Sequence, residues 1–302
     1  MVTVNKRVGL PQAVVINGVD AGGAMTAIIE QGYDSIIKTG PDGLEAQIED
    51  REAVYTRGQI ISQDFVHIVE LLTGAVGTYV FYERKSGVAA ETGYIKHTIT
   101  NPVIHRVALS ARKAQYATIT ADFECMAADP TMTFGDMWAP LDSQAAPSYI
   151  SAARGGYRIA SAVLGALNIY HLTSFDFTLA LTLVKECNDA DVGYTCVDAR
   201  PDGLTAEGSL NFQDSAVATG PPVLLTCQSL LAAARGDLVV TLNSSQGGAA
   251  KAITVAGVVF RTVRRTSDAN TPFADHVANF GVCNDPELPL TLAGANKILA
   301  VA

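Results

Sequence analysis

The chain has 302 residues, enough for one large domain or two of ordinary size. Hydrophobic residues make up 48% of it and charged residues only 17%, a balance that indicates extensive burial and excludes a largely disordered chain. The formal net charge of −9 argues against a protein that wraps nucleic acid, because neutralising phosphates needs clustered lysine and arginine.

Cysteine usage and hydropathy exclude two further classes. The five cysteines form no Cys-x-x-Cys pair and show no metal-ligand spacing, so we expect reduced thiols in a protein made in the cytosol. The first residues lack the apolar run of a signal peptide, and the longest apolar-leaning stretch, 159–167, is too short to cross a bilayer. We therefore expect a soluble protein with no membrane partner.

Strand patterns dominate the first half. Apolar and polar residues alternate with a period of two, and Val, Ile, Thr, Tyr and Phe are enriched. Gly32-Tyr33 and the Pro-Asp-Gly-Leu run at 41–44 predict turns between strands, and residues 64–72 predict a helix capped by Ser62 and stopped by Gly74. The expected strands are 14–16, 25–29, 35–38, 44–50, 78–82, 94–99 and 119–125.

The second half follows a segment of linker composition at 138–147, which is small, polar and contains two prolines. A helix is an open alternative around 149–166, although Gly155 and Gly156 interrupt it. Residues 222–234 predict a helix, with Pro at its start and Gly236 after its end. The expected strands are 175–187, 195–197, 204–212, 238–242 and 253–263.

The same landmarks occur twice in the same order. Each half has a Gly-Tyr pair, a Pro-Asp-Gly-Leu turn (41–44 and 201–204), a glycine, a helix with Leu-Leu, a second glycine, a strand, a polar turn and another strand. This order predicts an internal duplication; the alternative is that two β-domains share turn residues by chance. The expected organisation is a first β domain at 1–140, a linker with the uncertain helix at 141–163, and a second β domain with a C-terminal extension at 164–302.

Chemical motifs are absent from the sequence. It contains no nucleophile elbow, phosphate-binding loop or His-Glu-x-x-His zinc pair. His97 and His105 could bind a metal with a nearby carboxylate, but ordinary surface or strand histidines are the better interpretation, because a metal site needs three or four placed ligands. We expect no cofactor, no metal and no enzymatic activity.

Residues 188–193 resemble a calcium loop but lack ligands that such a loop needs, so a hairpin turn is favoured. Cys187 and Cys196 flank this turn and are expected on neighbouring strands, where a disulfide is the alternative to free thiols. A group of Met132, Phe134, Met137 and Trp138 is either a subunit contact, as aromatic and Met residues are at interfaces, or a cap over the domain core.

The duplicated β module with one flanking helix, acidic and without motifs, resembles the tail-tube and tail-ring proteins of long-tailed bacteriophages, whose fold recurs in the type VI secretion tube protein. The resemblance covers about 8–128 and 164–266 and lies in element order. It implies two tandem β-sandwich or barrel domains in a virion tail protein, assembled in the host cytoplasm. Such proteins form stacked rings around a lumen through which genomic DNA passes without specific binding.

Single-domain members of this family form six-membered rings, so the duplication implies a homotrimer with pseudo-sixfold symmetry. A homohexamer, in which one half lines the tube and the other decorates it, is the alternative. Other tail proteins would be further partners. The lumen should not hold phosphate; its candidate lining residues are Glu45, Gln47, Glu49, Thr205, Glu207, Ser209, Asn211 and Gln213. The alternative for these residues is a solvated outer sheet face.

Other functions remain open at this level. A distal-tail, baseplate or tail-terminator ring protein, or a capsid accessory protein, would use the same ring-forming fold. A carbohydrate-binding β-sandwich of the adhesin type would need an exposed aromatic platform, and the strands offer few outward Trp or Tyr residues.

Overall fold

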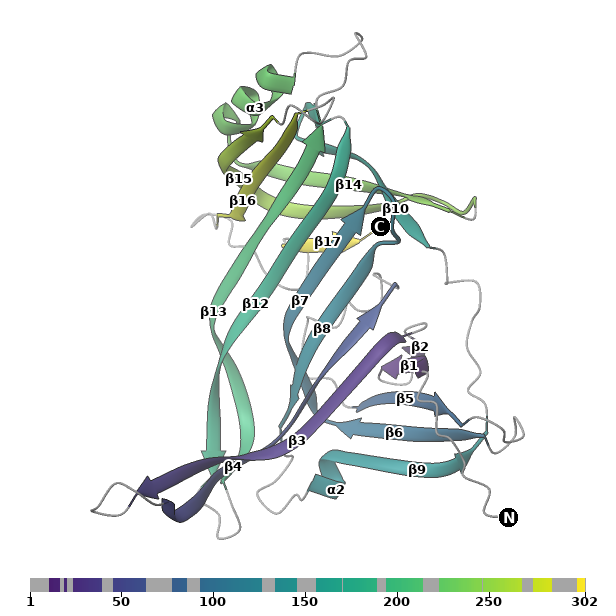
Figure 1. Cartoon of the computed structure of the whole chain (residues 1–302), viewed down its shortest axis with the longest axis vertical. Helices are drawn as coiled ribbons and strands as arrows, with labels where there is room; N and C mark the ends of the chain where they lie inside the picture. Colours follow the sequence, from purple (N-terminus) through teal and green to yellow (C-terminus); the bar gives the residue numbers. More distant parts are fainter. Residues whose placement is uncertain are drawn as a thin grey trace.

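The protein is mainly β and its sheets are built almost entirely from antiparallel pairs (Figure 1). The structure, a computed structural model, describes residues 11–16, 19–20, 24–39, 46–63, 78–85, 93–126, 134–145, 156–169, 171–188, 194–213, 223–245, 247–267, 274–283 and 298–301. Two short helices lie in this part of the chain, α2 (Phe134–Met137) and α3 (Val223–Ala232).

A five-stranded sheet belongs to the first half of the chain. Its strand order is β2-β1-β5-β6-β9. The strands are β1 (Pro11–Ile16), β2 (Val19–Asp20), β5 (Thr78–Arg84), β6 (Tyr94–Thr100) and β9 (Trp138–Gln144).

A twelve-stranded sheet, called the long sheet below, runs through both halves. Its order is β11-β10-β14-β15-β16-β13-β12-β7-β8-β4-β3, with β17 paired to β15. The strands from the first half are β3 (Ala24–Thr39), β4 (Ala46–Ser62), β7 (Pro102–Arg112) and β8 (Thr118–Cys125). Those from the second half are β10 (Tyr157–Leu164), β11 (Leu167–Ile169), β12 (Leu172–Asn188), β13 (Tyr194–Gln213), β14 (Gly236–Ser244), β15 (Lys251–Thr266), β16 (Asp275–Val282) and β17 (Leu299–Val301).

The strand pairings of residues 11–126 recur in residues 157–283. In the first set, β1 pairs with β2 and β5, β5 with β6, β7 with β8, β8 with β4, and β4 with β3. In the second set, β10 pairs with β11 and β14, β14 with β15, β15 with β16, β16 with β13, and β13 with β12. The single strand β15 thus takes the places of both β6 and β7.

The chain bends at an equivalent position in each set, between β6 and β7 in the first and within β15 in the second. Asn101 separates β6 from β7 with φ of 48°, and Gly257 lies within β15 with φ of 67°, the left-handed region that asparagine and glycine tolerate best. Met126 N–H donates to the Asn101 carbonyl at 3.0 Å, and Cys283 N–H donates to the Gly257 carbonyl at 2.9 Å. Each bend is therefore fixed by the residue that follows the last strand of its set.

Irregularities in register also recur. A β-bulge adds a residue to one strand, bends it and increases its twist. The shifts lie between Ala24 and Thr26 and between Leu172 and Ser174 in the two long hairpins, and between Ile104 and Arg106 and between Phe260 and Thr262 in the β7–β8 and β15–β16 pairs.

Two pairings connect the two sets of strands: a short parallel one between β13 and β4, at Tyr194↔Ala53 and Thr195↔Val54, and a longer antiparallel one. β12 pairs antiparallel with β7 from Ser174↔Arg112 to Ala180↔Arg106, and this pairing is called the inner join below. On its core face, Phe177 lies opposite Leu109, and both side chains are almost fully buried. Buried residues from both halves form one hydrophobic cluster. Figure 1 shows β12 and β13 running beside β7 and β8 along the length of the molecule.

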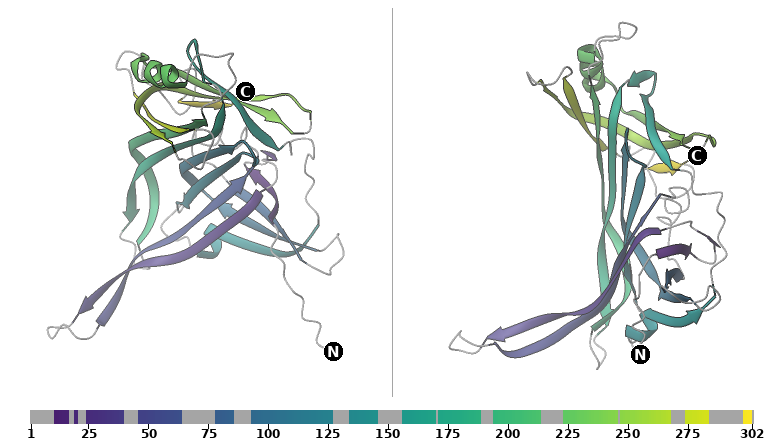
Figure 2. Two further views of the ribbon diagram at one scale, coloured as in Figure 1. Left: turned by 45° about the horizontal axis from the view of Figure 1, so that its top comes forward. Right: turned by 45° about the vertical axis from the view of Figure 1, so that its right-hand side comes forward.

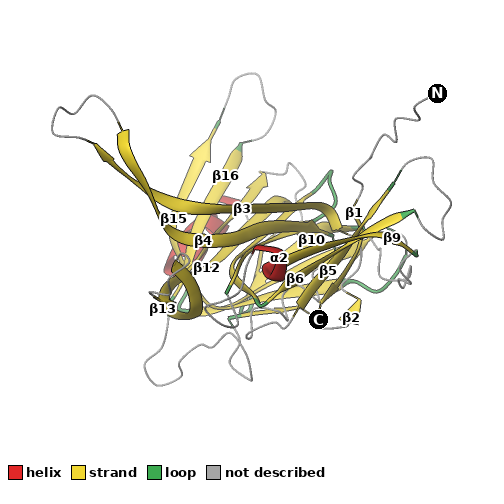
Figure 3. Ribbon diagram, turned by 90° about the horizontal axis from the view of Figure 1, so that it is seen from below, coloured by secondary structure: helices red, strands yellow, loops and turns green. Residues whose placement is uncertain are grey.

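The five-stranded sheet packs to one side of the long sheet (Figure 2, right). Seen from below, α2 lies beside β6 and β4 (Figure 3), and it contacts β4, β6 and β9. Met137 of α2 is buried, with its sulfur 3.6 Å from the Thr56 hydroxyl of β4. The β3–β4 hairpin projects beyond the rest of the molecule in both views of Figure 2.

Most of the expected strands are confirmed, as is the helix at 222–234, which is α3. Cys187 and Cys196 lie opposite each other on β12 and β13, as predicted for residues that flank a hairpin turn. The predicted helix at 64–72 and the Pro-Asp-Gly-Leu run at 41–44 lie outside the described residues. Strand β3 ends at Thr39 and β4 begins at Ala46, so these strands flank the 41–44 run.

The turn predicted at Gly32-Tyr33 is wrong. Strand β3 passes straight through it, with Gly32 opposite Tyr55 and Tyr33 opposite Val54. A Cβ built at Gly32 would lie 2.6 Å from the Tyr55 hydroxyl. The glycine therefore provides space for the tyrosine ring across the strand pair, not a turn.

The turn predicted at 201–204 is also wrong. These residues lie inside β13, where Thr182 faces Gly203 and Leu183 faces Pro201, so that Asp202 is the extra residue of a bulge. A bulge tolerates proline because the ladder is already interrupted there. The first Pro-Asp-Gly-Leu run thus lies between two strands and the second lies within one. The two runs are therefore not equivalent positions of the repeated strand pairings, although they were used to predict the repeat.

The helix considered around 149–166 is wrong over its described part, because residues 157–164 form β10. The linker assigned to 141–163 likewise contains the end of β9 and most of β10. Tyr157, Ile159 and Val163 are strand formers, and pairing with β14 overrides the helical tendency of the alanines. The second set of strands therefore begins at 157, before the expected boundary at 164.

Candidate functional site: the polar face and open edges of the long sheet

Side chains alternate across the long sheet. On β12, Phe175, Phe177 and Leu179 are buried in the core, whereas Asp176 and Thr178 lie on the opposite face. Because paired strands keep facing residues on the same side, this second face continues across neighbouring strands. We call it the polar face; one row of directly opposed residues on it is Ser110, Asp176, Ser209, Asn279 and Thr262.

Cross-strand contacts link the polar side chains at the inner join. Asp176 accepts hydrogen bonds from the Ser110 hydroxyl at 2.8 Å and from Arg112 Nη1 at 2.5 Å. On the same face, Asn211 Nδ2 donates to the Ser174 hydroxyl at 2.6 Å. Polar bonds on this face and apolar packing on the other thus hold the two halves together.

A second group of polar contacts covers β4, β7 and β8. Asp122 accepts from Gln59 Nε2 at 2.7 Å and from Arg106 Nη1 at 2.8 Å. Lys185, from the far half of β12, forms an ion pair with Glu124. Each of these acidic groups is matched by a basic or amide donor, so this part of the polar face carries little unbalanced charge.

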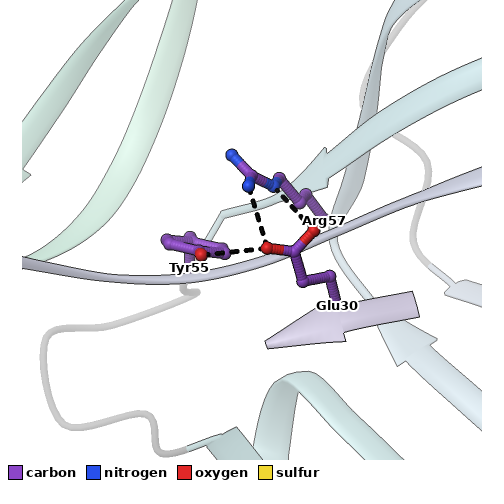
Figure 4. Close-up of polar contacts among 3 residues, drawn as sticks. All are labelled: Glu30, Tyr55 and Arg57. Carbon is purple, nitrogen blue, oxygen red and sulfur yellow. Dashed lines mark hydrogen bonds and ion pairs between the residues drawn. The ribbon is translucent and has the colours of Figure 1, made fainter. Parts of the chain in front are cut away.

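The edge of the sheet carries its own cluster (Figure 4). Glu30 of β3 accepts from Arg57 Nη2 at 2.9 Å and from the Tyr55 hydroxyl at 3.1 Å, and the Arg57 guanidinium lies 4.4 Å from the centre of the Tyr55 ring. Hydrogen bonding to Arg57, then to Tyr55, lowers the pKa of Glu30, and the same bond raises the pKa of Arg57. Glu30 is therefore held ionised at the edge.

The predicted lumen-lining residues of β13 share one face. Thr205, Glu207, Ser209 and Asn211 lie opposite polar-face positions of β12, while Leu210 and Phe212 between them are buried. Gln213 continues the same alternation and donates to Asp275 at 2.9 Å. Glu45 lies outside the described residues; Gln47 and Glu49 lie in β4, in a part of the strand whose side chains are not described.

Two unpaired strand edges of the long sheet lie at places equivalent to the two sides of the inner join. In the described part of the chain, no strand pairs with the edge of β3 that faces away from β4. Likewise, within the described residues, the part of β15 beyond Val258 pairs with β16 on one side and with no strand on the other. In the repeated pairings, β3 is equivalent to β12, and the C-terminal half of β15 is equivalent to β7. The open edges of β3 and β15 are thus equivalent to the edges of β12 and β7 that pair with each other in the inner join.

The residues considered as a subunit contact lie near the core of the first half. Met137 is 1% exposed and contributes no surface to such a contact in this chain, and Trp138 is half-buried. Met132 lies outside the described residues, and Phe134 begins α2, where its side chain is not described. Met137 therefore packs into the core of the first half.

Trp138 is connected to a buried histidine. Its indole N–H donates to His97 Nδ1 at 3.1 Å, and the His97 ring stacks on Phe81 with centroids 4.4 Å apart. His97 Nε2 lies 3.3 Å from Glu83 Oε2 without hydrogen-bond geometry. Burial lowers the pKa of His97, although Glu83 opposes the shift. This cluster joins β5, β6 and β9 and has a packing role.

The described residues bear on two kinds of feature, a cluster of metal ligands and a membrane-spanning helix. Within the described residues, no three His, Cys, Asp or Glu side chains gather as metal ligands. In the same ranges, no helix combines the length and apolar character needed to cross a membrane.

The sequence indicated the polar face on β13 but missed the groups that organise it. Asp176, Arg112 and Glu30 were not among the predicted site residues. The alternation of polar residues in 106–112 and 118–124 could have pointed to this face, whereas the open edges have no local signal. No protein-family model matches the chain, and no curated protein matches it.

Proposed function

We propose that the chain is a structural virion protein, a bacteriophage tail-tube subunit that forms stacked rings around a DNA-conducting lumen. One observation supports this above the others. Two like-paired strand modules are joined edge to edge in one continuous sheet, and the equivalent outer edges carry no partner strand in the described part of the chain. Because one module already pairs with the other module of the same chain, the same pairing repeated between chains would close a ring. Closure of the ring removes exposed strand edges.

The two modules are, in this proposal, tandem related domains of the tail-tube type, and three chains form a ring with pseudo-sixfold symmetry. The repeated bends at Asn101 and Gly257 support the relation between the domains. The polar face is the lumen lining. Two of its acidic groups, Asp122 and Asp176, are matched by basic partners, so the lining around them would neither strongly hold nor strongly repel DNA.

No enzymatic role is proposed. Imaging the purified protein at high concentration by negative-stain microscopy tests the structural role directly. Rings or hollow tubes of uniform diameter are the expected result. Well-behaved monomers at all concentrations, or binding of the monomer on a glycan array, would contradict it and favour the adhesin alternative.

A distal-tail, baseplate, tail-terminator or capsid accessory protein would use the same joins. The number of copies per particle separates these from a tube protein, because a tube subunit repeats along the whole tail. Quantitative mass spectrometry of purified particles is expected to give a copy number far above that of a single ring.

A further inference from the structure

The open edges of β3 and of the C-terminal half of β15 lie far apart in the long sheet. In the sheet order, β16, β13, β12, β7, β8 and β4 separate β15 from β3. At a spacing of about 4.8 Å between neighbouring strands, the two edges are roughly 33 Å apart along the sheet. Within the described residues of one chain, β3 and β15 do not pair with each other, and a β15 edge from a second copy would give β3 a partner strand.

The inner join supplies the template for this contact. Gly58 of β4 and Gly208 of β13 are equivalent positions in the two sets of strands. Ile29 of β3 pairs with Gly58, and Phe177 of β12 pairs with Gly208, so Ile29 is equivalent to Phe177. The preceding residues, Ile28 and Asp176, are therefore equivalent as well. On β15, Val263 lies opposite Ala278 just as Val107 of β7 lies opposite Ala121. Thr266 therefore corresponds to Ser110.

We infer that the β3 edge of one chain pairs antiparallel with the C-terminal half of β15 of a second copy, in the register of the inner join. Because Asp176 lies opposite Ser110 and Thr178 opposite Ala108, Ile28 lies opposite the neighbour's Thr266 and Glu30 opposite the neighbour's Arg264. This inference deepens the proposed function. It rests on the proposed function in one respect, that several copies of the chain assemble. We call this contact the outer join.

Charge and exposure favour this register. Glu30 and Arg264 are both exposed in the single chain, and the register places them on the same face of the joined sheet. Glu30 already accepts bonds from Arg57 and Tyr55, but a carboxylate has about four acceptor sites, so it has capacity for Arg264. Ile28 is 50% exposed, and the neighbouring strand would cover it. The residues of β3 from 24 to 32 contain no Pro or Lys, which commonly block edge pairing.

The outer join differs from the inner join on the core face. Where the inner join places Leu109 and Leu179, the outer join places Arg265 and Gln31. Less apolar surface is therefore buried, and the charged pair matters more. The outer join is consequently weaker than the inner join and sensitive to salt.

Disulfide trapping tests the register. The full-length chain carries Ile28→Cys with Thr266→Cys, and Cys283→Ser removes an exposed native thiol. Directly opposed residues lie within disulfide reach, whereas residues shifted by two are about 7–8 Å apart. After mild oxidation at assembling concentration, we expect covalent multimers from this pair and at least about fivefold fewer from the shifted pair Ile28→Cys with Arg264→Cys.

The outcomes separate the inference from the proposed function. Rings in microscopy without trapping of the matched pair, or with equal trapping of the shifted pair, would overturn the outer join and leave the ring proposal standing. Trapping without rings would support the outer join and count against the tube. Monomers with no trapping would overturn both.

Charge reversal gives an independent readout. Arg264→Glu faces Glu30 across the outer join and should raise the concentration needed for assembly about tenfold or more. Arg84→Glu makes the same change in net charge on β5, away from both edges, and should leave assembly unchanged. Equal effects of the two variants would contradict the register, provided that both retain the parent far-UV circular dichroism spectrum.

Discussion

Gly58 and Gly208 occupy the same place in the two sets of strands, each directly opposite a buried phenylalanine. Gly58 pairs with Phe123 and Gly208 with Phe280. A Cβ at Gly58 would lie 2.2 Å from the Ile28 carbonyl and 2.6 Å from Phe123 Cζ; at Gly208 the ring and a carbonyl would lie 2.4 and 2.5 Å away. Neither glycine has positive φ, so space and not backbone conformation requires it.

Gly208→Ala should therefore destabilise the protein by about 1–3 kcal/mol, since the added methyl group displaces a packed ring and backbone. Gly203→Ala in the same strand is the matched control, because its Cβ would find nothing nearer than 3.4 Å. Urea denaturation gives the free energy of unfolding of both variants. Losses of equal size would show that the close approach to Phe280 is not the cause.

His97 is the residue whose titration should be visible. Its pKa is lowered by burial, so below about pH 6.5 the unfolded chain takes up a proton that the folded chain resists. Stability from this group is thus complete above pH 6.5 and falls as the pH drops through the folded pKa. Protonation would also place a proton on Nδ1, which accepts from Trp138.

We expect His97→Gln to reduce the loss of unfolding free energy between pH 7.5 and pH 5. We also expect it to remove the pH dependence of the fluorescence of Trp138, the single tryptophan. Burial lowers the pKa of His105 as well, so His105→Gln is the control: it should flatten the stability profile but leave the tryptophan titration in place. A fluorescence titration that survives His97→Gln would refute this assignment.

At the scale of elements, the inner join combines a polar and an apolar face of unequal weight. Phe177 is fully buried, whereas the Arg112 and Asp176 side chains are 41% and 36% exposed. Exposed ion pairs contribute little, because water screens them and ordering two side chains costs entropy. Packing on the core face therefore contributes most of the stability of the β12–β7 pairing, and the ion pair favours its register.

Phe177→Ala should accordingly cost about 3–5 kcal/mol of unfolding free energy, and Asp176→Ala about 1 kcal/mol or less. Chemical denaturation followed by circular dichroism measures both. A larger loss from the aspartate variant would mean that the polar face dominates the join.

At the scale of the whole molecule, both sets of strands contribute to the long sheet and to one hydrophobic cluster. Units that share a core usually unfold together. We therefore expect one cooperative transition in urea, with coincident curves from Trp138 fluorescence, which reports on the first half, and from circular dichroism, which reports on the whole chain. Two separated steps would show that the halves are independent despite the inner join.

Local patterns were sufficient for the strands and for one face. The period-two alternation of 175–183 predicts both β12 and the separation of its buried Phe175 from the polar Asp176, because alternation is a property of the strand itself. The polar set Thr205 to Gln213 was predicted for the same reason. Repetition within the chain was also inferred, although from Gly-Tyr and Pro-Asp-Gly-Leu landmarks that the strand pairings do not align.

Tertiary structure alone decided the register, the bulges and the open edges. Pro201 and Gly203 carry a turn signal, yet pairing with β12 keeps the chain extended, because the ladder over a twenty-residue strand outweighs a local preference. Gly32 likewise has a turn signal in the sequence, but in the structure its missing side chain leaves space for the ring of Tyr55. The inner join brings together residues more than sixty positions apart, as in Arg112 and Asp176. Such contacts depend on which strands become neighbours, and no local pattern in the sequence carries that information.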